Sequence, residues 1–169
     1  MAMVLLLGGA RSGKSAMAAR LASDSRAPVT FIATAFAGDE EMAERIRLHR
    51  AARPDAWTTL EAPLDLVGAI RSTAAGDFVV VDCLTLWVSN LLGEGAGSAD
   101  VDAAAREAVA ALRSRDSVVV TNEVGLGIVP VNELARSFRD VLGSVNSRFA
   151  ESADRAVFMV AGRALDLPR

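Results

Sequence analysis

The segment Gly8–Ser15 limits the possible folds of this chain more than any other. It reads Gly-Gly-Ala-Arg-Ser-Gly-Lys-Ser and matches the pattern G-x-x-x-x-G-K-[ST]. The apolar run Met3–Leu7 precedes it and a helical pattern starts at Lys14, so strand, loop and helix follow in the required order. An ordinary Gly-rich turn is the alternative, but the only lysine of the chain occupies the one position where the motif demands it. The segment therefore predicts a phosphate-binding loop (P-loop).

A P-loop binds phosphate through its backbone N–H groups and through the positive end of the helix that follows. In this arrangement Lys14 would reach the β- and γ-phosphates, and the Ser15 hydroxyl would bind Mg²⁺. A second metal ligand is expected at the end of a neighbouring strand. The apolar run Phe78–Val81 ends in Asp82, as a Walker B strand does. A carboxylate that only caps a turn is the alternative interpretation of Asp82.

Short apolar runs alternate with longer amphipathic segments along the chain, which predicts an α/β fold with a mostly parallel sheet. The expected strands are Met3–Leu7, Val29–Ala33, Phe78–Val81, Val118–Thr121 and Ala156–Val160. The expected helices are Lys14–Ser23, Asp39–Arg53, Leu64–Thr73, Asp100–Arg115 and Asn132–Ser152. Trp57–Leu60 is a candidate further strand, antiparallel at an edge, and Gly93–Ser98 is the one stretch with the composition of a flexible segment.

Length and charge limit the class of protein. The 169 residues fit a single P-loop domain over residues 1–169, and 51% hydrophobic residues with 23% charged ones are typical of a globular chain. A formal net charge of −3 argues against nucleic acid as a partner. One cysteine, Cys83, excludes an intramolecular disulfide. The N-terminal apolar run is short and has no basic residues before it, so we expect a soluble, cytoplasmic protein without membrane insertion.

His49 is the only histidine of the chain and lies in the expected helix Asp39–Arg53. Met42, Ile46, His49 and Arg53 are spaced to share one helix face, so a packed or surface histidine is the plain interpretation. The functional alternative is that a neutral imidazole attacks phosphorus, with Arg50 and Arg53 binding phosphate oxygens.

Polar residues also follow several other strands of the expected sheet. They are Thr34, Glu61 and the run Thr121-Asn122-Glu123, and ligands of α/β sheets bind at this edge. Turn chemistry and a solvated carboxylate are the plain alternatives. The segment Val124–Pro130 contains two glycines that would allow close approach to a ligand.

Taken together, several motifs resemble one family, the bifunctional adenosylcobinamide kinase / adenosylcobinamide-phosphate guanylyltransferase of cobalamin biosynthesis. The resemblance runs from Leu5 to about Gly162. The motifs that carry it are the P-loop, Phe31-Ile-Ala-Thr34, Asp39-Glu-Glu-Met42, Ile46-x-x-His49-Arg50-x-x-Arg53-Pro54, Thr121-Asn-Glu-Val-Gly-x-Gly-Ile-Val-Pro130 and Ala135-Arg-x-Phe-Arg-Asp140.

The resemblance implies a P-loop NTPase-type, RecA-like sheet and two reactions. ATP or GTP phosphorylates adenosylcobinamide; GTP then donates GMP to a histidine, here His49, which passes it to adenosylcobinamide phosphate. The family's nucleotide contacts correspond to Gly8, Gly9, Ala10, Arg11, Ser12, Gly13, Lys14, Ser15, Ala33, Thr34, Ala35, Arg50, Ala51, Ala52, Arg53, Glu61 and Asp82. The family often has Glu where this chain has Asp82, so both Mg²⁺ and guanine stay open as its partner. The family association also suggests a homo-oligomer, with a trimer as one form.

Two other hypotheses compete with this resemblance. In the first, the chain is a P-loop kinase of another small metabolite and His49 is structural. In the second, it is a nucleotide-switched GTPase or regulatory module. Such a GTPase usually has an Asn-Lys-x-Asp box, which this chain cannot contain because its only lysine is Lys14.

Overall fold

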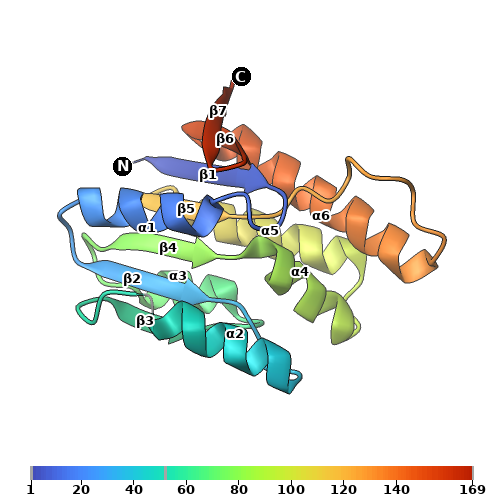
Figure 1. The fold of residues 1–169 in the computed structure, drawn as a ribbon, viewed down its shortest axis with the longest axis horizontal. Helices are drawn as coiled ribbons and strands as arrows, with labels where there is room; N and C mark the ends of the chain where they lie inside the picture. Colours follow the sequence, from blue (N-terminus) through green and yellow to red (C-terminus); the bar gives the residue numbers. More distant parts are fainter. Residues whose placement is uncertain (1, 52, 169) are drawn as a thin grey trace.

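The fold is a seven-stranded sheet between layers of helices, seen in a computed structural model that describes residues 2–51 and 53–168 (Figure 1). The strand order is β3-β2-β4-β5-β1-β6-β7. The strands are β1 (Met3–Gly8), β2 (Val29–Ala33), β3 (Thr58–Glu61), β4 (Phe78–Asp82), β5 (Ser117–Val120), β6 (Arg155–Val160) and β7 (Arg163–Leu167). All neighbouring strands pair in parallel except β6 and β7, so the predicted α/β class with one antiparallel edge strand is confirmed.

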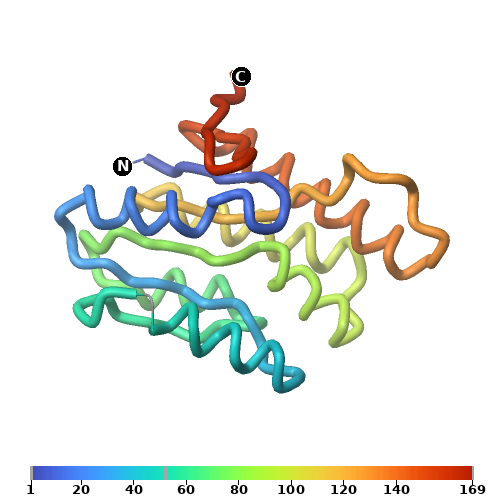
Figure 2. The backbone as a smooth tube through the Cα atoms, viewed as in Figure 1, coloured from blue at the N-terminus to red at the C-terminus, as the bar shows by residue number. Residues whose placement is uncertain are grey.

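Helices cover both faces of the sheet, and this explains why the central strands are apolar at nearly every position. The helices are α1 (Lys14–Asp24), α2 (Glu40–Ala51), α3 (Leu66–Ser72), α4 (Leu84–Gly93), α5 (Ser98–Leu112) and α6 (Glu133–Ser152). On one face α1 buries Ala18 and Ala22 against side chains of the sheet. Residues of α3, α4, α5 and α6 form the core on the other face, and the backbone trace shows α3 and α5 behind the strands (Figure 2).

The two edges of the sheet differ from the sequence-based expectation. The strand expected at Trp57–Leu60 is β3 and does lie at an edge, but it runs parallel to β2 and not antiparallel. The chain reaches β3 through the crossover that contains α2, and such a crossover returns the chain in the same direction. The antiparallel strand is β7, at the opposite edge, where a tight turn after Val160 reverses the chain.

Two helices differ from the expectation: α4 was not predicted, and α2 packs only weakly against the rest of the protein. α4 follows β4 directly, and the stretch Gly93–Ser98 is the short connection from α4 to α5. By contrast, α2 has no buried residue along its whole described length, although Met42 and Ile46 are partly covered. The helix ends at Ala51, so Arg53 lies beyond it and does not continue the predicted helix face. Across residues 2–51 and 53–168, no helix is long and apolar enough to cross a membrane.

Candidate nucleotide-binding site

The predicted site residues gather at the carboxyl ends of the parallel strands. The register pairs Ala33, at the end of β2, with Asp82 on one side and with Glu61 on the other. The P-loop leaves β1 at the same edge, which is on the right in Figure 1. Parallel strands bring their carboxyl ends together, and this is the usual ligand site of such sheets. The fold therefore brings the strand-end candidates together.

Two glycines give the P-loop its shape. Gly8 and Gly13 have φ values of 149° and 100°, which residues with side chains rarely adopt. A Cβ at Gly8 would lie 2.3 Å from the Met159 carbonyl oxygen. At the other end of the loop, the Gly162 N–H donates to the Ser12 carbonyl oxygen at 2.9 Å. The P-loop therefore contacts β6 at Gly8 and the turn between β6 and β7 at Ser12.

Lys14 begins α1, and its side chain turns back into the loop. Its Nζ donates to the carbonyl oxygens of Gly8 and Gly9 at 2.9 and 2.7 Å, and to Ser12 Oγ at 3.3 Å. Burial lowers the pKa of Lys14, and nearby Cys83 and Asp82 act in the opposite direction. The result is a cation that the protein has already ordered at the centre of the loop, as a phosphate-binding lysine requires.

Ser15 and Asp82 form a pair of oxygen ligands beside the loop. Ser15 Oγ donates to Asp82 Oδ2 at 3.0 Å. Burial raises the pKa of Asp82, while the Ser15 hydrogen bond and the nearby side chains of His49, Arg53 and Lys14 oppose that rise. A hydroxyl and a carboxylate side by side, next to a phosphate site, are hard oxygen donors of the kind that Mg²⁺ takes from a protein. The pair fits the predicted metal site.

Cys83 does not supply a nucleophile at this edge. The residue follows Asp82 and is buried. Burial, with the nearby Asp82 charge as the next cause, raises the pKa of its thiol to about 11. The thiol is therefore protonated at neutral pH, and thiolate chemistry is not available to it.

His49 lies near the end of α2, with an exposed side chain. It is still close enough to Asp82 to oppose the rise in the pKa of that carboxyl group. The next residue, Arg50, makes a long, exposed ion pair of 3.4 Å with Glu61 at the end of β3. Ala51 ends the helix and is exposed, whereas predicted contact Ala52 lies outside the described residues.

Arg53 connects the end of α2 to the sheet. Its guanidinium carbon lies 3.6 Å from the centre of the Phe31 ring. That ring is in turn stacked on Trp57 with centroids 6.4 Å apart. Burial lowers the pKa of Arg53, and Asp82 is the first charge that counteracts this. Arg53 is therefore a positive charge held on the Phe31 ring, close enough to Asp82 for the two charges to interact.

Of the predicted run Ala33-Thr34-Ala35, Thr34 has a clear structural task. Its Oγ1 donates to the Cys83 carbonyl oxygen at 2.7 Å and accepts from the Cys83 N–H at 2.8 Å. Asn90 of α4 donates to the Thr34 carbonyl oxygen at 2.8 Å. The buried Thr34 side chain thus ties β2 to the end of β4. Contact of this run with a nucleotide stays a prediction.

The run Thr121-Asn122-Glu123 is held by a network of polar side chains. The run was predicted from the sequence, but its two partners, Thr85 and Asn146, were not. Thr121 Oγ1 donates to Asn146 Oδ1 at 2.7 Å, and the Asn122 N–H donates to Thr85 Oγ1 at 2.7 Å. Asn146 also donates to the Asn122 carbonyl oxygen at 3.0 Å. Thr85 belongs to the unexpected α4 and Asn146 to the middle of α6, so no local signal marked either residue.

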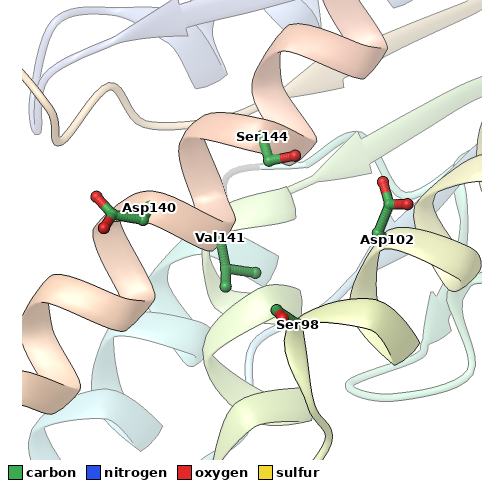
Figure 3. A pocket seen from close by; sticks show the side chains of 5 residues that line it. All are labelled: Ser98, Asp102, Asp140, Val141 and Ser144. Atoms are coloured by element: carbon green, nitrogen blue, oxygen red, sulfur yellow. The ribbon is translucent and has the colours of Figure 1, made fainter.

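Two hollows lie away from the P-loop. One of about 210 Å³ lies between α5 and α6, on the face opposite α1, and is lined by Ser98, Asp102, Asp140, Val141 and Ser144 (Figure 3). Asp102 there already accepts hydrogen bonds from Arg106 and Arg148. The other, of about 340 Å³, lies beside the end of β3 and includes Glu61 and Pro63. Only the second hollow adjoins the strand-end residues.

Comparison with known proteins gives consistent matches over almost the whole chain. The family described as cobinamide kinase / cobinamide phosphate guanyltransferase matches residues 4–167. The bifunctional adenosylcobalamin biosynthesis protein CobP of Pseudomonas aeruginosa is 48% identical over 166 residues, covering 96% of this chain and 95% of that protein. The bifunctional adenosylcobalamin biosynthesis protein CobU of Salmonella typhimurium is 42% identical over 175 residues, covering 95% and 96%.

Similar solved structures are more distant and bear on the fold alone. The flagellar accessory protein FlaH from Methanocaldococcus jannaschii has a TM-score of 0.54 and 16% identity, covering 98% of this chain and 76% of that one. An ATPase from the type III secretion system of pathogenic bacteria has a TM-score of 0.57 and 10% identity, covering 98% and 56%. These neighbours confirm the expected α/β fold, a mostly parallel sheet flanked by helices.

Proposed function

Because the chain belongs to the cobinamide kinase / cobinamide phosphate guanyltransferase family, we propose that one site at its strand edge performs both reactions, through a guanylylated His49. The kinase step moves the γ-phosphoryl group of ATP or GTP to the hydroxyl of adenosylcobinamide. The second step moves GMP from GTP to the phosphate formed in the first. Adenosylcobinamide-GDP and pyrophosphate are the products.

The observation that carries this proposal is that the P-loop and the end of the helix bearing His49 meet the same edge of the sheet. Ser15, which follows Lys14, donates to Asp82 Oδ2 at 3.0 Å. Arg50, which follows His49, pairs at 3.4 Å with Glu61, and the strand register aligns Glu61 with Ala33 and Ala33 with Asp82. Lys14 sits where it would hold the β- and γ-phosphates. In guanylylation the same contacts would stabilise the pyrophosphate as it leaves.

The covalent step follows from the chemistry of a neutral imidazole. A ring nitrogen of His49 attacks the α-phosphorus of GTP, a P–N bond forms, and the bond to the bridging oxygen breaks with its electron pair on pyrophosphate. A phosphate oxygen of adenosylcobinamide phosphate then attacks the same phosphorus and the P–N bond breaks. Arg50 and Arg53 would neutralise the α-phosphate oxygens.

Mg²⁺ would be held by Ser15 and Asp82, and bound there it would neutralise charge on the phosphates. The 3.0 Å contact between Ser15 Oγ and Asp82 Oδ2 supports the metal as the partner of Asp82 rather than guanine. Glu61 lines a hollow and carries an exposed carboxylate, so it remains available for contact with a nucleotide. We infer, as the sequence suggested, that the chain forms a single domain and acts on small molecules. We also infer that it works in the cytoplasm and as a homo-oligomer.

The decisive experiment is incubation with [α-³²P]GTP and Mg²⁺, followed by His49→Ala and His49→Asn variants. The native chain should acquire a label that acid removes and base does not, as a phosphoramidate does. Both variants should lose it, because neither offers an imidazole nitrogen to the α-phosphorus. Undiminished label in either variant would exclude His49. Phosphorylation of adenosylcobinamide without any covalent GMP would instead favour a plain kinase.

A further inference from the structure

The two reactions differ in one chemical requirement that none of the roles assigned above supplies. An alcohol that attacks phosphorus must lose its proton, so the kinase step needs a proton acceptor. A neutral imidazole attacks through a lone pair, and a phosphate dianion carries no proton to lose. A base dedicated to the kinase step should therefore be dispensable for guanylylation. Lys14 is a cation, and Asp82 is engaged with Ser15.

Glu123 is a carboxylate in the right part of the fold. It follows β5, the strand between β1, which leads to the P-loop, and β4, which ends in Asp82. Its N–H donates to the Gly8 carbonyl oxygen at 3.2 Å, and the same oxygen accepts from Lys14 Nζ at 2.9 Å. Glu123 therefore lies directly beside the lysine that would hold the transferred phosphoryl group.

The backbone that carries Glu123 is fixed on its interior side. The buried hydrogen bonds of Thr121 and Asn122 with Asn146 and Thr85, described above, hold the two preceding residues. A satisfied buried polar network of this kind gives a segment one defined position. Glu123 thus carries a partly exposed carboxylate on a rigid backbone segment. A group that receives a proton from an incoming substrate needs such a fixed position.

The carboxylate itself is oriented by Gly125. The Gly125 N–H donates to Glu123 Oε1 at 2.5 Å. A Cβ at position 125 would lie only 2.8 Å from that oxygen, so glycine permits the approach. Among the described residues this is the single hydrogen bond recorded for the carboxylate, which leaves Oε2 available to a substrate hydroxyl.

We propose that Glu123 is the general base of the kinase reaction, an inference that rests on the proposed function. The substrate hydroxyl oxygen attacks the γ-phosphorus, and the bond from that phosphorus to the β–γ bridging oxygen breaks. Its electron pair leaves with the nucleoside diphosphate. The hydroxyl proton passes to the Glu123 carboxylate and from there to water.

The test is to measure the two half-reactions separately in Glu123→Gln. The kinase is assayed with adenosylcobinamide and nucleotide, and the guanylyltransferase with adenosylcobinamide phosphate and [α-³²P]GTP. We expect the kinase kcat to fall at least a hundredfold, on the scale of a lost general base, with KM for the nucleotide unchanged. GMP labelling and transfer should stay within about twofold of the native rate, because neither removes an alcohol proton.

Glu133→Gln is the matched control, since it removes a carboxylate from the exposed first turn of α6 at the other end of the same connection. Both of its half-reactions should be native. Glu123→Asp keeps the carboxylate and should recover part of the kinase rate.

Two outcomes would overturn the inference. Native kinase kcat in Glu123→Gln would show that the carboxylate takes no proton. Equal losses in both half-reactions would assign Glu123 to nucleotide binding or to folding. If the native chain itself turns over neither cobinamide substrate, the proposed function fails, and this result is distinct from native kinase activity that survives Glu123→Gln.

Discussion

The phosphate side of the site and the histidine side are built in opposite ways. Lys14 is buried and makes three hydrogen bonds inside a loop that β6 and the β6–β7 turn support. His49 is exposed on α2, which buries none of its residues, all of which are described. Internal hydrogen bonds thus fix Lys14 in the P-loop without a bound nucleotide. The helix that carries His49 is instead attached to the sheet through residues at and beyond its C-terminal end, Arg50 and Arg53. Under the proposed function His49 would serve GTP and adenosylcobinamide phosphate in turn, and a helix without buried residues would let it move between them.

The sharpest test of this contrast is catalytic. Lys14→Ala should lower both half-reactions on the order of 10³-fold, because both transition states develop charge on phosphates that the lysine holds. His49→Ala should lower guanylylation alone. Arg20→Ala, on the exposed side of α1, is the control and should be native in both. Separate rate measurements with each cobinamide substrate would decide, and a kinase that survives Lys14→Ala would break the comparison.

The second test is thermodynamic and uses one glycine from each side. Gly8→Ala should reduce the free energy of unfolding by about 3 kcal/mol, because of its φ of 149° and the contact with the Met159 carbonyl. Gly38, which precedes α2, has only a Phe36 ring carbon at 4.0 Å from a built Cβ. Gly38→Ala should change stability by less than about 0.5 kcal/mol. Urea unfolding measures both, and similar losses would contradict the contrast.

Hydrogen exchange offers a third test that needs no substitution. Amides of α2 should exchange at least about tenfold faster than those of α1, because a helix without buried residues opens locally while the core stays folded. Mass spectrometry of peptides that cover Glu40–Ala51 and Lys14–Asp24 would give the comparison. Equal protection would show that α2 opens only with the rest of the protein.

The smallest effect concerns the two arginines near the end of α2. Arg50→Gln should change the free energy of unfolding by less than about 0.5 kcal/mol, because its 3.4 Å pair with Glu61 joins two exposed side chains. Arg53→Gln should cost about 1 kcal/mol, since it removes a half-buried cation from the Phe31 ring. Thermal unfolding of the two variants side by side would show the difference. A larger loss in Arg50→Gln than in Arg53→Gln would contradict this prediction.

The sequence was most informative where a residue type has few possible roles. The P-loop and the apolar strands Met3–Gly8 and Phe78–Asp82 could be located because their composition or spacing leaves few alternatives. In contrast, α4 was missed because Leu84–Gly93 follows β4 at once and is apolar on several faces. Periodicity cannot separate helix from strand in such a run.

Local sequence patterns could not predict the direction of an edge strand or the pairing partners of a residue, because both depend on the path of the whole chain. Whether β3 runs parallel or antiparallel depends on the path of the chain through α2, and its own four residues carry no trace of that path. β7 is exposed along its length, so it lacks the apolar signal of a strand and is defined only by pairing with β6. Likewise, Asn146 is an ordinary helix residue until the fold sets it against Thr121.

The hydrogen bond from the Gly162 N–H to the Ser12 carbonyl oxygen also has a consequence for folding during synthesis. The P-loop leaves the ribosome before its partners on β6 and on the turn after it, which come much later in the sequence. Contacts so far apart along the chain form late, after much of the sheet has assembled. A growing chain that has not yet released β6 therefore carries an unfinished P-loop, and tight nucleotide binding would mark a molecule in which β6 has joined the sheet.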